Sequence, residues 1–578
     1  MKQRILVASA LWWFGFTPAV AQESGHVPVS MVQDWSSRHM IFSEEVPREA
    51  RGAMLGEPRF WQQYLRRHAE RPQAVFEDGG RREHERDHDR DRDRDRNRDS
   101  DGHHKRHRKA ASQRDWSFPL GGGSGGRISG PAKFVFDVTA APSCTTDFVV
   151  TGIAANGAAN QANIIGLNRL YTNPAGSGFC AGTGPAVMFA YTVGAGQVPS
   201  LVALSLNGQK IAFSENDTAA GTSNFHVLQF KTGAGNGTSA TAPAVPGTGN
   251  TAVDTKIALA SGSTTGPFVD YAHDVAYVTT NGTASVVHKF TGVFNGTLAE
   301  VTTGGWPATI PGNPAVSTPV YDNVSRHVFA TDGTGHIDYI DDSVIPAVVH
   351  SGTFSFAATG ITAAPVVVDS SRQKVYAFAG NNGGASAVVA QADTNLTAGS
   401  RVVLAVGDNT TNTVLEGDFN NAYYTGVGTP FLYVAGNDGT TTHRAALYNI
   451  GFDGTFKLNA TPANGPLLLS VGGTNNVIAS PLTEFFNSRL SRDFMFVSVS
   501  DACTNGAGGL PTAGCIRSLD ITSGFPAAAT VNNVVLGASG GTGTITVDNN
   551  NVAAEASSVY YTSQTGNNIV KATQAALQ

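Results

Sequence analysis

Four aspartates in one short stretch are the clearest candidates for chemistry in this sequence. The segment DGTGHIDYIDD places Asp332, Asp338, Asp341 and Asp342 beside a Gly turn. Carboxylate oxygens around a turn are the ligands that Ca2+ prefers in proteins. The stretch lacks the regular carboxylate spacing and the closing Glu of an EF-hand loop, so the polar ends of a hairpin are the competing interpretation. Calcium is the one ion that this stretch suggests, and no other cofactor is expected.

The cysteines form a second candidate group. Cys144, Cys180, Cys503 and Cys515 are the four in the chain, and no two of them have the spacing of a zinc motif. An even number of cysteines in an exported protein indicates disulfides. Three pairings are possible and the sequence does not choose among them. A Cys503–Cys515 bond would close a Gly-rich loop, and a Cys144–Cys180 bond would staple the first folded unit.

The elements that must position these residues recur as strand-turn-strand units at intervals of roughly 45 to 65 residues. Clear copies begin at Gly266 (GPFVDYAHDVAYV), Thr318 (TPVYDNVSRHVFA) and Ala364 (APVVVDSSRQKVYAF). Each has an apolar run that ends near an Asp, then a polar turn, then a strand containing VY or VF. Antiparallel repeats of this length predict an all-β fold, with a β-propeller over residues 127–578.

The number of blades follows from one aromatic residue that recurs in each unit. Eight such anchors would give eight blades, or seven if the terminal pieces share one blade, and seven are favoured. Strands from both chain ends would close the ring and remove its open edge, with KFVFDV at 133–138 as the candidate closing strand. The anchors are Tyr171, Phe213, Tyr277, Phe329, Tyr376, Tyr433, Phe496 and Tyr560.

Asp270, Asp322 and Asp369 occupy equivalent places after the first strand of successive units. Lactonase-like propellers hold a metal with carboxylates around their channel, which would make these residues part of a hydrolase or lyase site. An Asp that ends a strand more often caps the following turn through its own backbone. Repetition at equivalent positions favours turn capping, because catalysis needs different residues that converge once.

Other catalytic patterns do not occur in the sequence. The Trp-containing endings of quinoprotein blades do not recur, and there is no G-x-S-x-G, H-E-x-x-H or Walker motif. Charged residues make up 15% of the chain, and the repeat region is acidic. An acidic body argues against nucleic acid as a partner.

The N-terminus predicts export. Lys2 and Arg4 precede an apolar run that ends in a small-x-small pattern at Ala21, which is typical of a signal peptide over residues 1–21. The run is too short for a membrane span, so no transmembrane segment is expected. The mature protein is expected to be secreted, periplasmic or on the cell surface.

Residues 22–126 differ from the repeat region. Residues 22–79 are expected to form a partly helical arm, because Phe60, Trp61, Tyr64 and Leu65 recur on one helical face. Residues 80–126 contain an Asp/Arg/His tract and a Gly-rich linker. The tract has no apolar side chains to bury, so it is expected to be disordered.

Several segments resemble an uncharacterised family of exported bacterial proteins, typical of soil-dwelling Gram-negative groups. They are QDWSSRHMIFS at 33–43, RDWSFPLG at 114–121, and body segments such as FVDYAHDVAYV and VKATQAALQ. The resemblance implies a secreted β-propeller with a separate N-terminal arm, and it brings no catalytic residues with it. Trp35 and Trp116, in the two Asp-Trp-Ser segments, are candidate anchors that dock into the propeller.

The favoured function is binding, of a glycan, a peptide or a partner protein outside the cytoplasm. A binding face would expose an aromatic or apolar patch, to which Tyr423, Tyr424, Phe485 and Phe486 are candidate contributors. The alternative is a metal-assisted hydrolase or lyase with its site in the propeller channel. An enzyme would bring a cluster of titratable groups from several blades to one mouth of the channel.

Overall fold

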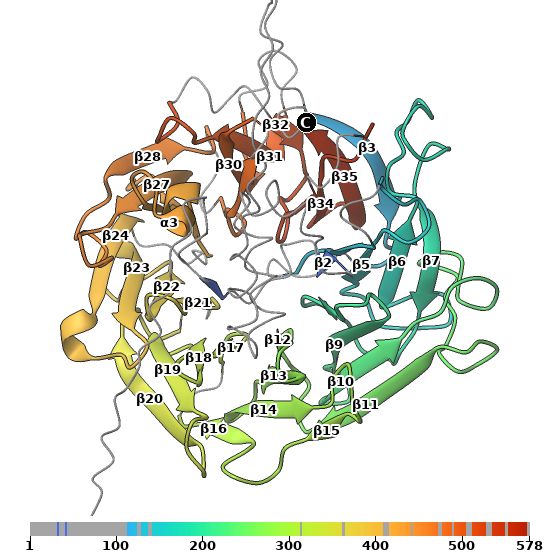
Figure 1. Cartoon of the computed structure of the whole chain (residues 1–578), viewed down its shortest axis with the longest axis horizontal. Coiled ribbons are helices and arrows are strands. Elements are labelled where there is room, and N and C mark those ends of the chain that lie inside the picture. The colour runs from blue at the N-terminus through green and yellow to red at the C-terminus, as the bar shows by residue number, and fades with distance from the viewer. Residues whose placement is uncertain are drawn as a thin grey trace, which may run out of the picture.

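Eight β-sheets stand in a ring and form a β-propeller (Figure 1). The computed structural model describes residues 32–33, 41–42, 112–123, 129–136, 141–312, 315–360, 364–408, 416–440, 443–471, 477–487, 490–504, 511–527, 535–548 and 553–574. The eight-bladed alternative is therefore the one adopted, rather than the favoured seven. The reason is that the terminal strands share a complete eighth blade and do not replace one of the others.

Each blade is an antiparallel sheet whose first strand lies innermost and whose fourth strand lies at the rim. Blade 1 contains β4 (Ala132–Val135), β5 (Phe148–Gly152), β6 (Ile164–Asn168) and β7 (Ala186–Tyr191), and blade 2 contains β8 (Ala203–Leu204), β9 (Lys210–Asp217), β10 (Thr222–Gln229) and β11 (Val253–Leu259). Blade 3 contains β12 (Phe268–Asp270), β13 (Val275–Thr280), β14 (Ser285–Thr291), β15 (Ala299–Glu300) and β16 (Ala308–Ile310). Blade 4 contains β17 (Val320–Asp322), β18 (His327–Thr331), β19 (His336–Asp341) and β20 (Val348–Ser355).

The second half of the ring repeats the pattern. Blade 5 contains β21 (Val367–Asp369), β22 (Lys374–Ala379), β23 (Ser386–Asp393) and β24 (Val402–Asp408), and blade 6 contains β25 (Asp418–Phe419), β26 (Phe431–Asn437), β27 (Ala445–Gly451) and β28 (Asn464–Leu468). Blade 7 contains β29 (Thr483–Asn487), β30 (Arg492–Asp501), β31 (Ala513–Asp520) and β32 (Val535–Gly537). Blade 8 contains β33 (Thr546–Asp548), β34 (Ser558–Thr562), β35 (Asn568–Gln574) and β3 (Ser112–Pro119). The short helix α3 (Asn421–Thr425) follows β25, and η2 (Ala398–Ser400) precedes β24.

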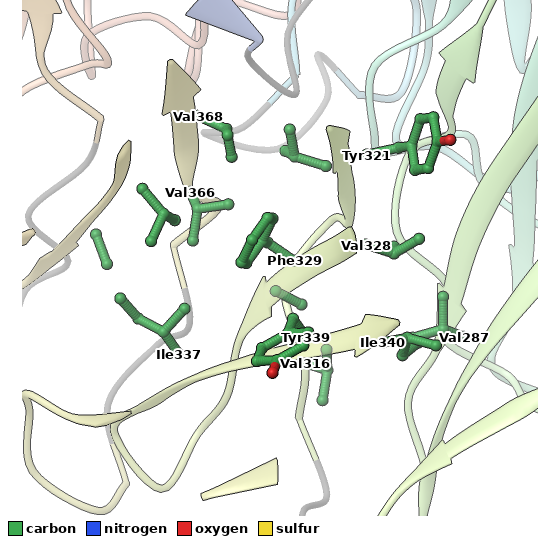
Figure 2. Packing of buried hydrophobic residues seen from close by; sticks show 14 of the residues in the cluster. Val287, Val316, Tyr321, Val328, Phe329, Ile337, Tyr339, Ile340, Val366 and Val368 are labelled. Carbon is green, nitrogen blue, oxygen red and sulfur yellow. The ribbon is translucent and has the colours of Figure 1, made fainter. Parts of the chain in front are cut away.

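The hydrophobic core lies between neighbouring blades. Every residue of β13 and β18 is buried, whereas all but one residue of the rim strand β20 are exposed or half-buried. Sheets that pack face to face bury both faces of their central strands, which explains the continuous apolar runs of the second strands. Figure 2 shows Phe329 and Ile337 of blade 4 in one cluster with Val366 and Val368, at and before the first strand of blade 5.

Blade 8 closes the ring with strands from both ends of the chain. β3 pairs antiparallel with β35, from Ser112 opposite Gln574 to Pro119 opposite Asn568, so the blue and red ends of the chain meet in Figure 1. The prediction of a closing strand at 133–138 was wrong, because residues 133–135 belong to β4, the innermost strand of blade 1. The propeller therefore begins upstream of residue 127, with the second Asp-Trp-Ser segment as its closing strand.

Two short N-terminal strands add to the inner edges of the ring. β1 (Val32–Gln33) pairs antiparallel with β21 of blade 5, and β2 (Ile41–Phe42) pairs parallel with β4 of blade 1. Val32 is buried in the core of blades 5 and 6. In a ring of eight, blades 1 and 5 lie opposite each other, so β1 and β2 contact opposite sides of the ring from within.

Other expectations for the N-terminal region fall outside the described residues. These are the signal peptide, the helix around 60–65, the charged tract and the docking of Trp35. In the part of the chain that the structure describes, no helix is long and apolar enough to cross a membrane.

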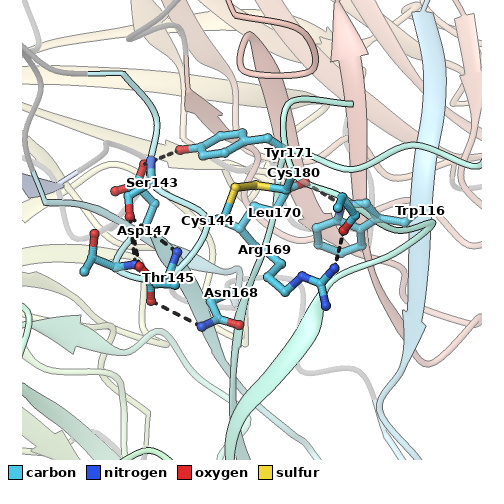
Figure 3. Close-up of a disulfide and its surroundings, with 12 residues drawn as sticks. Trp116, Ser143, Cys144, Thr145, Asp147, Asn168, Arg169, Leu170, Tyr171 and Cys180 are labelled. Carbon is cyan, nitrogen blue, oxygen red and sulfur yellow. Dashed lines mark hydrogen bonds between the residues drawn. A yellow bond between two sulfur atoms is a disulfide. The ribbon is translucent and has the colours of Figure 1, made fainter. Parts of the chain in front are cut away.

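The cysteines pair as two disulfides within single blades. Cys144 bonds Cys180 in blade 1, and Cys503 bonds Cys515 in blade 7, which confirms the expected disulfides and resolves their connectivity. Figure 3 shows the first bond beside Asp147 and Tyr171. Each bond joins two segments of one blade, so the disulfides reinforce single blades and not the contacts between blades.

Removing either disulfide should lower the free energy of unfolding, and removing the bond that closes the longer loop should lower it more. The bonds close loops with sequence separations of 36 and 12 residues. Chain entropy predicts losses of about 4 kcal/mol for Cys144→Ala with Cys180→Ala and about 3 kcal/mol for Cys503→Ala with Cys515→Ala. Urea denaturation of each double variant measures both values. A larger loss for the shorter loop would contradict loop entropy as the origin.

Candidate functional site

The aspartates at the ends of the first strands cap turns, as the turn interpretation predicted. Asp270 Oδ1 accepts the Ala272 N–H at 3.1 Å. Asp322 Oδ2 accepts the Ser325 N–H at 2.9 Å, and Asp369 Oδ1 accepts the Ser371 N–H at 2.9 Å. These bonds satisfy backbone donors that a tight turn leaves without a ladder partner. The repeated Asp is therefore a structural feature of each blade.

Two of these aspartates also reach the next blade. Gln373 Nε2 of blade 5 donates to Asp322 Oδ2 of blade 4 at 3.2 Å. The Tyr423 hydroxyl of blade 6 donates to Asp369 Oδ2 of blade 5 at 2.7 Å. Because both carboxylates are buried, such bonds hold neighbouring blades in one register. They do not converge on a single point, as a catalytic site would require.

The first two candidate calcium ligands lie together in blade 4. Asp332 Oδ1 accepts the N–H groups of Thr334 and His336, each at 2.9 Å, in the turn between β18 and β19. Asp338 Oδ1 accepts the Gly352 N–H at 2.7 Å. Burial, together with the nearby carboxylate of Asp332, raises the pKa of Asp338 to about 8. Asp338 is therefore protonated at neutral pH, and a protonated acid is a poor cation ligand.

The other two candidates lie at the far end of β19. Asp341 Oδ1 accepts the Ser343 N–H at 2.9 Å. Asp342 receives the Lys289 ammonium at 2.6 Å and the Trp306 Nε1–H at 2.8 Å, both from blade 3. The four aspartates thus divide between the two ends of one strand. Among the described residues, no three His, Cys, Asp or Glu side chains gather as a metal site, so the calcium expectation gains no support from this stretch.

A buried group of carboxylates between blades 6 and 7 was not predicted from the sequence. Asp418 Oδ2 accepts the Glu484 N–H at 2.8 Å, and its Oδ1 accepts the Tyr424 hydroxyl at 2.8 Å. Asp493 Oδ2 accepts the Asn421 N–H at 2.8 Å. Burial is the main cause that raises the pKa of Asp493, and the charge of Asp418 adds to it. The repeated Asp pattern could not have indicated this group, because Asp418 begins its strand whereas the repeated Asp ends it.

A histidine between two carboxylates was also missed. His226 Nδ1 lies 2.9 Å from Asp254 Oδ1, and Nε2 lies 3.2 Å from Glu215 Oε2. The imidazole stacks on Phe213 with ring centroids 4.9 Å apart. Burial works to lower the pKa of His226, but the hydrogen bonds to Asp254 and Glu215 outweigh it, so the pKa is raised. The side chain is fully buried, so this arrangement ties β9, β10 and β11 together and faces no substrate.

The prediction of an exposed aromatic patch is wrong. Tyr423, Tyr424 and Phe485 are buried, and Phe486 is half-buried. The two tyrosines lie on α3, where Tyr423 stacks on Phe419 at 3.9 Å between ring centroids. Paired aromatics on a strand or a short helix next to a sheet fill the space between blades, because burial stabilises their large apolar surface.

Trp116 is a buried anchor, as expected for the second Asp-Trp-Ser segment. Its Nε1–H donates to the Leu170 carbonyl of blade 1 at 2.9 Å, as Figure 3 shows. Its ring lies 6.1 Å from that of Tyr560 in blade 8. The indole therefore joins the closing strand to both blades at the seam of the ring.

Exposed apolar side chains gather on one side of the propeller. Strands alternate in direction, so the loops from first to second strand and from third to fourth strand lie on the same side, which we call the loop face. Eight of the twelve exposed large apolar residues among the described ones lie in these loops. They are Phe136, Phe179, Val245, Val324, Val344, Ile345, Val427 and Leu490.

The remaining four lie elsewhere. Val253, Val348 and Val403 lie on rim strands, and Val471 lies in a connection between blades. The described loops between second and third strands contain none of the twelve, so Val471 is the one member of the set in the described connections of the opposite side. The eight residues of the loop face are distributed over blades 1, 2, 4, 6 and 7. Exposed apolar side chains on one face are a feature of interaction surfaces, so the loop face is the candidate functional site.

No protein-family model matches the chain, and no curated protein sequence matches it. Among solved structures, BamB from Moraxella catarrhalis is similar at 11% identity with a TM-score of 0.37, over 80% of this chain and 97% of its own. Sqt1 from Chaetomium thermophilum is similar at 12% identity with a TM-score of 0.43, over 80% and 98%. A putative 6-phosphogluconolactonase from Bacteroides fragilis is similar at 13% identity with a TM-score of 0.31, over 68% and 99%. Likeness at this level carries no argument about function.

Replacing Asp338 should change how stability depends on pH. Its raised pKa means that the folded protein keeps a proton which the unfolded chain releases, so stability falls as pH rises from about 4 to 8. Asp338→Asn stays neutral and can still accept the Gly352 N–H. We expect it to be more stable than the parent at pH 8 by about 1–3 kcal/mol, with the difference vanishing near pH 4.

Urea denaturation across this pH range measures the effect, and Asp341→Asn is the control. Burial works to raise the pKa of Asp341, but hydrogen bonds from Ser343 lower it below its ordinary value. Its removal should therefore cost a little stability at neutral pH. If Asp338→Asn and Asp341→Asn shift stability in the same direction at pH 8, the assignment of a protonated Asp338 is wrong.

Replacing His226 should destabilise the protein most at mildly acidic pH. The pKa of His226 is raised, so its contribution is fully present below the ordinary histidine pKa and is lost as pH rises through the folded value. His226→Gln leaves the buried Glu215 and the partly buried Asp254 without their cation and should cost about 3 kcal/mol at pH 6. The half-exposed His273, paired with Asp270, is the control, and His273→Gln should change the unfolding free energy by less than about 1 kcal/mol.

Proposed function

We propose that this protein is an exported binding protein that takes an extended peptide or a protein partner on its loop face. The observation that carries the proposal is the gathering of exposed apolar side chains in loops of one side of the ring. Ile345 is 89% exposed and Val427 is 62% exposed. Leaving aliphatic side chains in water is unfavourable unless a partner covers them.

The chemistry of the loop face favours a polypeptide over a glycan as ligand. Six of its eight apolar residues are Val, Ile or Leu, which match the apolar side chains of another chain better than a polar sugar. The inner edges of blades 1 and 5 already pair with short extended segments through main-chain hydrogen bonds. The same mode serves peptide recognition in many proteins, so the ring is suited to extended chain.

Both disulfides support a site of action outside the cytoplasm, because such bonds persist in oxidising compartments. The alternative of a hydrolase or lyase in the channel gains no comparable support. Carboxyls with raised pKa values lie in four different blades, at Asp338, Asp369, Asp493 and Asp115. All four are buried, whereas a catalytic carboxyl must reach its substrate.

Selection of peptides from a random library tests the proposal. A phage-displayed library of random peptides is panned against the full mature chain, and enriched peptides are synthesised for affinity measurement by fluorescence anisotropy. Ile345→Ser and Val427→Ser should weaken binding by about tenfold or more, as expected for residues at the centre of an interface.

Val253→Ser and Val403→Ser are the matched controls. These valines are 53% and 42% exposed but lie on rim strands, so binding should stay within about twofold of the parent. Equal losses in the two pairs of variants, or no enrichment of peptides, would reject the loop face as a peptide-binding surface. Circular dichroism of all four variants checks that the fold is kept.

A further inference from the structure

A buried lysine and a buried aspartate meet at the seam where the ring closes. Lys571 Nζ on β35 lies 2.5 Å from Asp115 Oδ2 on β3, and neither side chain is exposed. The two residues are 456 positions apart in the sequence. They belong to the last and the first strand of the propeller, so any bond between them would join both ends of the folded chain.

The backbone of β3 is distorted where this contact forms. Arg114 lies opposite Ala572 and Trp116 lies opposite Lys571, so Asp115 is an extra residue in a β-bulge. A bulge changes the direction of a side chain relative to a regular strand. Here it leaves Asp115 buried beside Lys571, and regular alternation would not bring the two groups together on the same side.

A third carboxyl completes the group. Glu555 Oε2 lies 3.9 Å from Lys571 Nζ. The Thr573 hydroxyl lies 2.7 Å from Asp115 Oδ2 and 2.5 Å from Glu555 Oε2. A hydroxyl has one hydrogen to donate, so both contacts are full hydrogen bonds when one carboxyl is protonated and donates to Thr573. The geometry therefore accommodates a shared proton beside Lys571.

The surroundings make the ion pair costly and so bring the neutral forms of both partners closer to it in energy. Trp116, Tyr560 and Ile569 enclose the seam in one apolar cluster. Burial raises the pKa of Asp115 to about 6 and lowers the pKa of Lys571. In an apolar site a carboxylic acid beside an amine competes with the ion pair, because charging both groups costs desolvation energy.

A second buried lysine in the same region provides a contrast. Lys133 Nζ lies 3.1 Å from Asp548 Oδ2, 3.1 Å from the Tyr171 hydroxyl and 3.2 Å from the Phe134 carbonyl. Three acceptors match the three donors of an ammonium group, so the site satisfies the full hydrogen-bonding capacity of this lysine. Among the described residues, Lys571 Nζ has a hydrogen bond to Asp115 alone.

We propose that Lys571 and Asp115 join in an intramolecular isopeptide bond that closes the propeller covalently. The lone pair of the neutral Lys571 Nζ attacks Cγ of the protonated Asp115 carboxyl. Nζ loses a proton to Glu555, and a proton passes through Thr573 to the departing hydroxyl. The Cγ–O bond breaks, the Nζ–Cγ amide bond forms and one water leaves. No electrons are exchanged, so no oxidant or co-reactant is needed.

Intact-mass spectrometry of the native, full mature chain tests the proposal directly. After reduction of the disulfides, the mass should be about 18 Da below that of the open chain, the mass of one water. Trypsin should not cleave after Lys571. The digest should contain one branched peptide that joins residues 115–127 to residues 518–578. The full open-chain mass together with cleavage after Lys571 would overturn the proposal and leave a buried ion pair.

Two variants separate the reaction from general effects on folding. Lys571→Arg keeps a positive charge but cannot form the amide, so its mass should match the open chain. Glu555→Gln keeps both reactants and removes the proton acceptor, so the cross-linked fraction should form at least about tenfold more slowly.

Lys133→Arg is the control and should keep the loss of water. Unchanged formation in Glu555→Gln would remove Glu555 from the mechanism, and loss of water in Lys571→Arg would reject Lys571 as the nucleophile.

Discussion

The pairing of β3 with β35 is the contact on which the rest of the ring depends. Every blade buries its two faces against its neighbours, so an open ring would expose the apolar faces of blades 1 and 8 together with a sheet edge. Seven backbone pairs between the two ends of the chain close that gap. Trp116 and the Asp115–Lys571 contact add side-chain bonds at the same seam. Closure by both termini removes the edge at which a sheet would otherwise pair with another chain.

A protein with few charges places several of them between its blades. Asp322 and Asp369 each cap a turn in their own blade and accept a hydrogen bond from the next blade. Asp342 accepts from Lys289 and Trp306 in the same way. Buried polar contacts of this kind contribute little net stability but strongly disfavour any other arrangement, since breaking one leaves an uncompensated group in an apolar surrounding. They fix the order and register of blades whose apolar cores are chemically alike.

The use of the inter-blade surfaces for packing explains where a binding function can lie. Inter-blade surfaces are filled by branched and aromatic side chains and by paired polar groups, so the described titratable clusters are structural. The loops are free of these constraints, and on one side of the ring they carry apolar residues that the fold does not use. The inner edges of the ring are a second available surface, and the N-terminal strands β1 and β2 occupy part of it. Recognition is thus separated from the elements that hold the ring together.

The strand-turn-strand repeat, the all-β class and the turn-capping role of Asp270, Asp322 and Asp369 could be predicted from the amino-acid sequence, because these depend on residues within a few positions of each other. Eight blades were among the predicted possibilities, but the choice required knowing that residues 112–119 complete the last one. The burial of Tyr423 and Tyr424, the surroundings of His226 and the meeting of Asp115 with Lys571 became known only from the folded chain. Each depends on strands or blades that only folding brings together, and no local pattern encodes a partner 456 residues away.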